Sequence, residues 1–147
     1  MFQPMTCGLT PAGAGVERKC WTILGQTYWP LAITEACFAF EALLPPGTFV
    51  PPHVQEGQDE FIRVLEGSLD LMLDGVAARA GPGDFVRIPR GTVHGVFNNG
   101  AVPARALGWA TPALNLAELF ERADGVADPE EVLRMATANG VRFLPPD

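Results

Sequence analysis

The chain contains only two histidines, His53 and His94, and both lie near side chains that could take part in the same chemistry. Gln55 follows His53 by two positions, so on a β-strand the two side chains would point to the same face. Glu60 follows after a loop that contains Gly57. Imidazole and carboxylate groups are common ligands of divalent metals, and an amide oxygen is a weaker, neutral ligand. If the fold brings these four side chains together, they could form a metal site.

A purely structural role is the alternative for these residues. A buried histidine is usually a hydrogen-bonded polar residue of the core. Glu60 could pair with His53 or with His94 without any metal, because a buried carboxylate needs a partner. Both alternatives require the three side chains to lie together, and the elements that carry them must therefore converge.

Short strands separated by turns are the predicted elements of most of the chain. The sequence has 16 glycines and 14 prolines, which recur between segments rich in apolar, β-branched and aromatic residues. Asp74-Gly75 is a typical hairpin turn. Trp29-Pro30 is expected to separate the first two strands. The predicted strands are residues 20–28, 33–44, 49–55, 60–65, 68–73, 76–80, 85–88, 93–97 and 104–110.

The pattern becomes helical after Pro112. Asp128 and Pro129 are typical of a helix start, and Gly140 is typical of a helix end. We therefore predict an all-β fold, a small antiparallel β-barrel or jelly roll with two short C-terminal helices packed on it. The predicted organisation is a flexible N-terminal arm over residues 1–16, the barrel over residues 17–111 and the helices over residues 112–147.

Composition excludes several classes of function. The chain has 17 acidic and 10 basic side chains, a net charge of −7 and no basic cluster, so nucleic acid is not an expected partner. No apolar stretch is long enough to span a membrane, and the N-terminus does not resemble a secretory signal. The three cysteines, Cys7, Cys20 and Cys37, form no CxxC pair, which favours reduced thiols and a cytoplasmic location.

Two segments resemble the paired motifs of the cupin superfamily. Residues 47–67 read GTFVPPHVQEGQDEFIRVLEG, which resembles the first cupin motif: a glycine, five residues, His-x-His, a glutamate and a final glycine. Residues 83–98 read GDFVRIPRGTVHGVFN and match the second motif throughout. One position departs from the pattern, because Gln55 stands where the family usually has its second histidine. The C-terminal segment also resembles bacterial quercetinase-like cupins.

The resemblance implies a ligand set and an activity. It implies that His53, Glu60 and His94 hold one divalent metal ion (Fe, Mn, Ni, Co or Zn), and Gln55 occupies the fourth ligand position. It also implies a dioxygenase-type enzyme that brings O2 and a small enolic or phenolic substrate together, with Glu60 as ligand or catalytic base. A metal-dependent isomerase or decarboxylase, or a binding protein without catalysis, remains open. Similar cupins pair as homodimers, so a homodimer is expected.

Overall fold

The structure is a computed structural model, and it describes residues 2–144 of the chain. Eleven strands and two helices follow a short 3-10 helix, η1 (Val16–Arg18). The helices are α1 (Leu116–Ala123) and α2 (Pro129–Ala138). The strands are β1 (Trp21–Ile23), β2 (Gln26–Ile33), β3 (Phe38–Leu44), β4 (Phe49–Gln55), β5 (Asp59–Glu66), β6 (Leu69–Leu73), β7 (Val76–Ala80), β8 (Phe85–Ile88), β9 (His94–Phe97), β10 (Ala104–Thr111) and β11 (Val141–Phe143).

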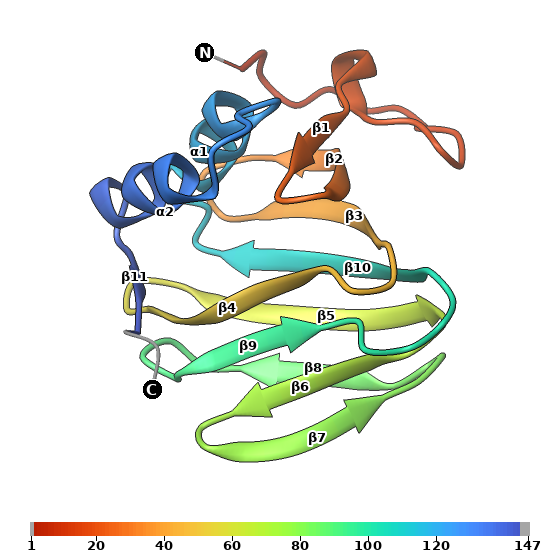
Figure 1. Cartoon of the computed structure of the whole chain (residues 1–147). Helices are drawn as coiled ribbons and strands as arrows, with labels where there is room; N and C mark the ends of the chain where they lie inside the picture. The colour runs from red at the N-terminus through yellow and green to blue at the C-terminus, as the bar shows by residue number, and fades with distance from the viewer. Residues whose placement is uncertain (1, 145–147) are drawn as a thin grey trace.

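The strands form two antiparallel sheets that pack face to face (Figure 1). The six-stranded sheet has the order β1-β2-β3-β10-β5-β8, and the five-stranded sheet has the order β11-β4-β9-β6-β7. In β2, β3, β5 and β10, alternate residues are buried between the two layers. On β5, for example, Ile62 and Val64 are buried whereas Arg63 and Leu65 are exposed. This alternation places Glu60 on the inward face as well.

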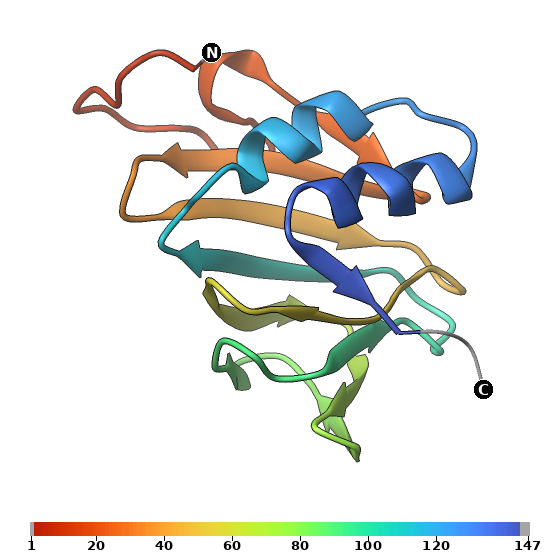
Figure 2. The same ribbon diagram turned by 90° about the vertical axis from the view of Figure 1, so that its left-hand side faces the viewer.

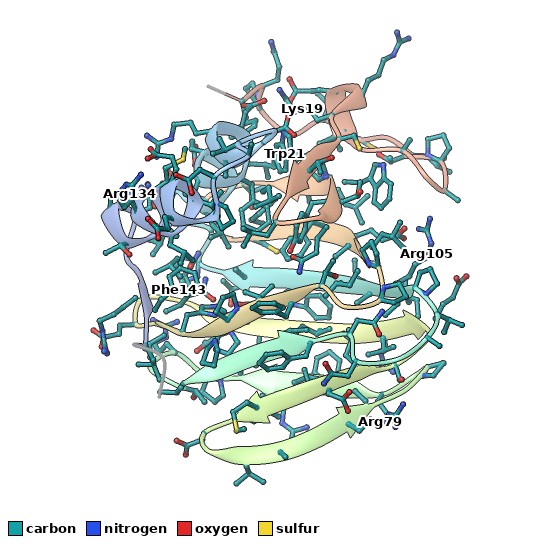
Figure 3. All side chains as sticks on the ribbon, viewed as in Figure 1. Lys19, Trp21, Arg79, Arg105, Arg134 and Phe143 are labelled. Atoms are coloured by element: carbon teal, nitrogen blue, oxygen red, sulfur yellow. The ribbon has the colours of Figure 1, made fainter. Side chains whose placement is uncertain are left out.

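The two helices cover the part of the larger sheet that the smaller sheet leaves open. They lie beside β1, β2 and β3, and β11 continues from them to the edge of β4 (Figures 1 and 2). Phe120 of α1 packs against aromatic rings from these three strands, with ring centroids 5.0 Å from Tyr28 and 5.5 Å from Phe40. Trp21 of β1 lies under the same helix, 6.1 Å from Phe120 (Figure 3). The helices therefore complete the second layer of the core.

The first predicted strand is wrong in its extent. Residues 20–28 were expected to form one strand, but Leu24 and Gly25 both have positive φ, 53° and 82°, and turn the chain into the β1–β2 hairpin. Two positive φ values are what a tight hairpin turn of this kind requires, and leucine gives no sign of it in the sequence.

Trp29-Pro30 was also expected to lie between strands, but both residues belong to β2. The pairing of β2 with β3 shifts its register between Pro30 and Ala32. Such an irregularity accommodates a proline, which has no N–H to donate to the ladder. The chain then turns at residues 34–37, inside the segment that was expected to begin the second strand, and β3 starts at Phe38.

The all-β fold class and the two short C-terminal helices are confirmed. The last strand, β11, was not predicted. It follows α2 directly and pairs antiparallel with β4. In the described residues 2–144, neither helix has the length or the apolar character that crossing a bilayer requires.

Candidate metal centre

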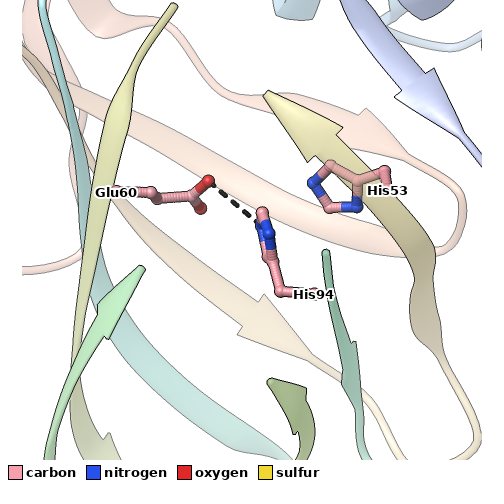
Figure 4. A group of neighbouring side chains, drawn as sticks. All are labelled: His53, Glu60 and His94. Carbon is pink, nitrogen blue, oxygen red and sulfur yellow. Dashed lines mark ion pairs between the residues drawn. The ribbon is translucent and has the colours of Figure 1, made fainter. Parts of the chain in front are cut away.

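Three of the expected ligands meet between the two sheets. His53 on β4 and His94 on β9 are direct register partners in the smaller sheet, with ring centroids 4.1 Å apart. Glu60 reaches them from β5 of the larger sheet, and its Oε2 lies 3.5 Å from His94 Nε2 (Figure 4). One ligand atom from each of the three residues lies within 4.8 Å of the others. The arrangement is therefore compact enough for a single ion.

Backbone contacts set the orientation of both imidazoles. His53 Nδ1 lies 2.8 Å from the carbonyl oxygen of Pro51, and His94 Nδ1 lies 3.1 Å from that of Thr92. A carbonyl oxygen only accepts hydrogen bonds, so each Nδ1 must carry the proton and donate. The lone pair of each ring then lies on Nε2, the atom that is free to bind a cation. A hydrogen bond of this kind on the second nitrogen is typical of metal-binding histidines.

The local sequence explains how these rings reach the centre. The pairing of β4 with β9 is irregular between Val50 and His53, where Pro51 and Pro52 cannot donate to the ladder. His94 follows a turn in which Thr92 N–H donates to Pro89 O at 3.1 Å. Prolines therefore shape the backbone before both histidines, directly before His53 and in the turn that leads to His94.

A glycine completes the turn before His94. Gly91 has a φ of 79°, which favours glycine at this position. Its N–H donates to the carbonyl oxygen of Gln55 at 3.0 Å, so the turn is bonded to the end of β4. The two motifs are therefore connected through the backbone as well as through their side chains.

The three groups perturb one another electrostatically. Burial lowers the pKa of His53, and the nearby His94 lowers it further. Burial would also lower the pKa of His94, but the Glu60 carboxylate outweighs burial and raises that pKa above its ordinary value. Burial would raise the pKa of Glu60, but His94 and His53 hold it below its usual value. The centre therefore favours an ionised carboxylate and at least one neutral imidazole.

The unpaired ring nitrogen of His94 is a second indication that these residues could hold a metal ion. His94 Nε2 is fully buried and has no hydrogen-bond partner within the described part of the chain. Its 3.5 Å separation from Glu60 Oε2 is long for a hydrogen bond. Two ligands of one tetrahedral ion lie about 3.4 Å apart when each bond is about 2.05 Å. An ion between them would therefore satisfy the unpaired nitrogen without moving either side chain far.

Gln55 is buried beside this centre and is oriented by a chain of amides. Its Nε2 donates to Gln58 Oε1 at 2.9 Å. Gln58 Nε2 in turn donates to the carbonyl oxygens of Pro112 and Ala113, at 3.0 and 2.8 Å. Because the nitrogen of Gln55 is engaged by Gln58, its amide oxygen remains as an acceptor for a protonated His53 or as a ligand for a metal. That the oxygen binds a metal stays a prediction.

The three residues lie on the wall of a cavity of about 140 Å³ between the sheets. Aliphatic and aromatic side chains from both sheets, both helices and β11 form most of the wall. Phe143 of β11 lies next to the centre, with its ring 5.4 Å from that of His53. The polar residues of the wall are Gln26, Tyr28, His53, Gln55, Glu60 and His94.

The sequence reasoning missed four residues of this site: Gln26, Tyr28, Gln58 and Phe143. Gln26 and Tyr28 are two apart on β2 and both point inward. That alternation was a usable signal, because a polar residue on the buried face of a strand calls for an explanation. Gln58 lies in the loop between β4 and β5, where no strand alternation marks its side chain, and Phe143 lies in the strand that was not predicted.

Comparison with known proteins agrees with the motifs. Residues 40–109 match the family described as the cupin domain. The tetracenomycin polyketide synthase protein TcmJ of Streptomyces glaucescens is 32% identical over 95 residues, which are 65% of this chain. The matched region spans 60% of the length of TcmJ.

Solved structures share the fold. The polyketide cyclase RemF from Streptomyces resistomycificus is 26% identical with a TM-score of 0.61, over 73% of this chain and 80% of RemF. A sugar phosphate isomerase of the cupin superfamily from Silicibacter pomeroyi is 27% identical with a TM-score of 0.55, over 61% of each chain. Sequence motifs, the two-sheet fold and these similarities agree, and the chain belongs to the cupin superfamily.

Proposed function

We propose that this protein is a metal-dependent enzyme that acts on a small organic substrate with an enol or phenol oxygen. The observation that carries the proposal is the convergence of His53, Glu60 and His94 on the wall of a largely apolar cavity. A purely structural cluster would be expected to satisfy its own polar atoms. Here the Nε2 of His94 is buried without a hydrogen-bond partner inside the described residues, and Glu60 Oε2 stands 3.5 Å away.

A divalent metal ion held by these residues would supply Lewis acidity to a substrate oxygen. The residues of the chain would do the remaining work. Glu60, kept ionised by the two histidines, would accept a proton from the substrate hydroxyl or from a carbon next to a carbonyl. Gln55, oriented by Gln58, would present its amide oxygen to the same place. The apolar walls would exclude water from the reacting groups.

The reaction that we favour is a proton-transfer reaction without redox change, such as enolisation followed by ring closure or isomerisation. TcmJ is named as a polyketide synthase protein and RemF as a polyketide cyclase, and a third relative is named as a sugar phosphate isomerase. Polyketides and sugar phosphates both carry carbonyl groups with acidic neighbouring C–H bonds. An ionised carboxylate beside a metal site is suited to remove such a proton.

A dioxygenase reaction is the second candidate, and the donor set favours it. Two histidines and one carboxylate are the ligands of many non-haem Fe(II) oxygenases and leave coordination positions for substrate and O2. The same enolic or phenolic substrate class would serve this reaction. A binding role without turnover is the third outcome that an experiment must separate.

Proton transfer and dioxygenation differ in the metal that they require and in their need for O2. We would load metal-free protein with Zn(II) or Fe(II) and add 2′-hydroxyacetophenone, which has a phenol oxygen and an enolisable methyl ketone. Proton-transfer chemistry predicts exchange of the methyl protons for deuterium in D2O, followed by NMR, with either metal and without O2. A dioxygenase predicts O2 consumption with Fe(II) only. If protein fully loaded with metal shows neither deuterium exchange nor O2 consumption, catalysis on this class of compound is contradicted. A binding role would then remain.

Glu60→Gln is the variant that tests the proposed base. Exchange is expected to fall by 10²-fold or more, since general acid–base catalysis typically contributes about 10²–10⁴-fold. Glu66→Gln is the matched control, because Glu66 lies on the same strand with its side chain 73% exposed. His94→Ala should lose both metal and activity. Equal exchange rates in wild type and Glu60→Gln at equal metal content would contradict the assigned role.

A further inference from the structure

A second polar group faces the cavity from a strand that carries no proposed metal ligand. Gln26 and Tyr28 lie on β2, three places away from β5 in the order of the larger sheet. Both side chains line the same cavity as Glu60 and the two histidines. The sequence motifs of the metal centre do not include them. Their role is therefore a separate question from that of the metal centre.

The hydrogen bonding of this pair leaves one donor unused. Tyr28 O–H donates to Gln26 Oε1 at 2.5 Å. The amide nitrogen Nε2 of Gln26 has no hydrogen-bond partner among residues 2–144, although Gln26 is only 1% exposed. Leaving a buried amide donor unpaired costs about 1–3 kcal/mol, so such donors are rare unless something else binds them.

Tyr28 is suited to hold the amide in this orientation. Its ring packs 5.6 Å from Phe40 and 5.0 Å from Phe120, which restricts its movement. Burial raises the pKa of its hydroxyl strongly, and the Glu60 carboxylate adds to this effect. The hydroxyl therefore stays protonated and donates to the oxygen of Gln26, so the nitrogen is the atom that remains for a ligand.

We propose that Gln26 Nε2 donates a hydrogen bond to a carbonyl oxygen of the substrate, and that Tyr28 is the positioning residue that orients the amide. The substrate would have a hydroxyl group at the metal centre and a carbonyl group at Gln26. This inference rests on the proposed function only in taking the cavity as the substrate site. It narrows the substrate to hydroxyaryl or enolic compounds that carry a second oxygen away from the metal.

The volume of the cavity limits the size of the part of the substrate that it can enclose. Its volume of about 140 Å³ is close to that of an engineered apolar cavity of about 150 Å³ that binds benzene. The apolar wall between the two polar ends includes Phe40, Ala106 and Gly108. One ring that carries two oxygen substituents therefore matches the volume of the cavity and its two polar groups.

The test compares ligands that differ in the carbonyl group alone. The first pair is 4′-hydroxyacetophenone and 4-isopropylphenol, which have the same number of non-hydrogen atoms. The second pair is the corresponding 3-substituted compounds, which place the carbonyl at a different angle. Dissociation constants are measured by calorimetry on Zn(II)-loaded protein. The preference is the dissociation constant of the isopropyl compound divided by that of the carbonyl compound. In at least one pair, this ratio is expected to be about tenfold larger for the wild-type protein than for its variants.

Two substitutions remove the donor in different ways. Gln26→Met keeps the length of the side chain and removes both polar atoms of the amide, and Gln26→Leu removes them with a branched side chain of different shape. Either is expected to abolish the preference for the carbonyl compound. Tyr28→Phe should reduce it, because the amide is no longer oriented. Thr27→Val on the opposite face of β2 is the control and should leave the preference unchanged.

The outcomes are distinct from those that test catalysis. Zinc content should be the same in wild type and in all four variants. The preference should also persist in protein treated with EDTA, even if the enzyme proves inactive on every compound tried. A wild-type protein that does not discriminate within either pair would overturn the inference. The inference would also be overturned if a Gln26 variant that folds normally kept the same preference for the carbonyl compound.

Discussion

The two histidines of the centre have the same backbone contacts but different electrostatic surroundings. Each donates from Nδ1 to the carbonyl two residues earlier. The carboxylate of Glu60 lies near both rings, but only at His94 does it outweigh burial and raise the pKa. At His53, burial and the neighbouring His94 ring lower the pKa in spite of the carboxylate. In metal-free protein, His94 is therefore the histidine that takes up a proton first as the pH falls.

This asymmetry predicts how the stability of metal-free protein depends on pH. The raised pKa of His94 stabilises the fold below about pH 6.5, the unfolded value, and the effect is lost as the pH rises through the folded pKa. The lowered pKa of Glu60 stabilises the fold above about pH 4.3 and is lost as the pH falls through its folded pKa. The pair should therefore contribute most between about pH 4.3 and 6.5.

Glu60→Gln in EDTA should show this window. Its melting temperature should lie below that of wild type by about 3 °C near pH 5.5, and by less at pH 8. Because the chain has two histidines, NMR can follow each ring separately, and the pKa of His94 should fall in the variant. A deficit that is the same at every pH would mean that packing, and not charge, accounts for the effect.

The amide chain beside the centre gives a test of Gln55 as a ligand. Gln58→Leu removes the group that engages the nitrogen of Gln55, without touching Gln55 itself. If the Gln55 oxygen binds the metal, metal affinity should fall about 10–100-fold, as it does when a residue that orients a ligand is lost. Gln55→Leu should cause at least the same loss, measured by competition with a chelator. Unchanged affinity in both variants would exclude Gln55 from the ligand set.

Among the individual residues of the site, the sequence predicted those that belong to motifs with fixed spacing. His53, Glu60 and His94 were found because their spacing is set by strands and turns that the sequence also shows. Gln26 and Tyr28 were not found, because the unused donor of Gln26 becomes visible only when its neighbours in space are known. Burial and pairing depend on contacts between distant segments, and no local pattern reports them.

Strand β10 makes room for the cavity through its small inward residues. Ala106, Gly108 and Ala110 face the core at positions where large side chains are common. A Cβ on Gly108 would lie 2.8 Å from the ring of Phe40, which leans over the glycine. The absence of a side chain at Gly108 therefore allows the Phe40 ring to approach the backbone of β10, where a Cβ would collide with it.

Gly108→Ala should force the Phe40 ring to move toward the cavity. We expect a loss of about 1–3 kcal/mol in the free energy of unfolding, which is typical of overpacking, together with weaker binding of ring-sized ligands. Gly81→Ala is the control, because a Cβ there meets nothing within 4 Å, and its effect should stay within about 0.5 kcal/mol. Urea denaturation measures both, and equal stabilities would show that Phe40 adapts without cost.

Most elements followed from alternation and turn residues. Strands β4, β7 and β8 have the predicted bounds. Strands β6, β9 and β10 differ from the prediction by one residue at one end, and β5 is one residue longer at each end. The secondary-structure predictions that were wrong concern segments whose conformation depends on contacts with distant parts of the chain. Leu24 takes a positive φ in the β1–β2 turn, Pro30 is tolerated because the β2–β3 register shifts, and three-residue β11 is a strand only because β4 has a free edge.

The whole molecule offers edge strands to a partner, and the predicted homodimer remains to be tested. Strand β1 is one edge of the larger sheet, and the segment expected to form the N-terminal arm precedes it in the chain. We predict a dimer in which the arm of one protomer extends the sheet of the other. Sedimentation velocity of the full chain should give twice the mass of one chain, and a monomer at micromolar concentration would contradict this.

The proposed metal ligands come from both layers of the sandwich, two from the smaller sheet and one from the larger. An ion bound to all three would be a reversible cross-link between the layers, and thermal unfolding would have to break it. At a free zinc concentration 100 times the dissociation constant, the gain is about 2.7 kcal/mol, or roughly 5–10 °C in melting temperature for a chain of this size. His94→Ala should abolish the gain, so that heating alone would measure how much of the protein carries metal.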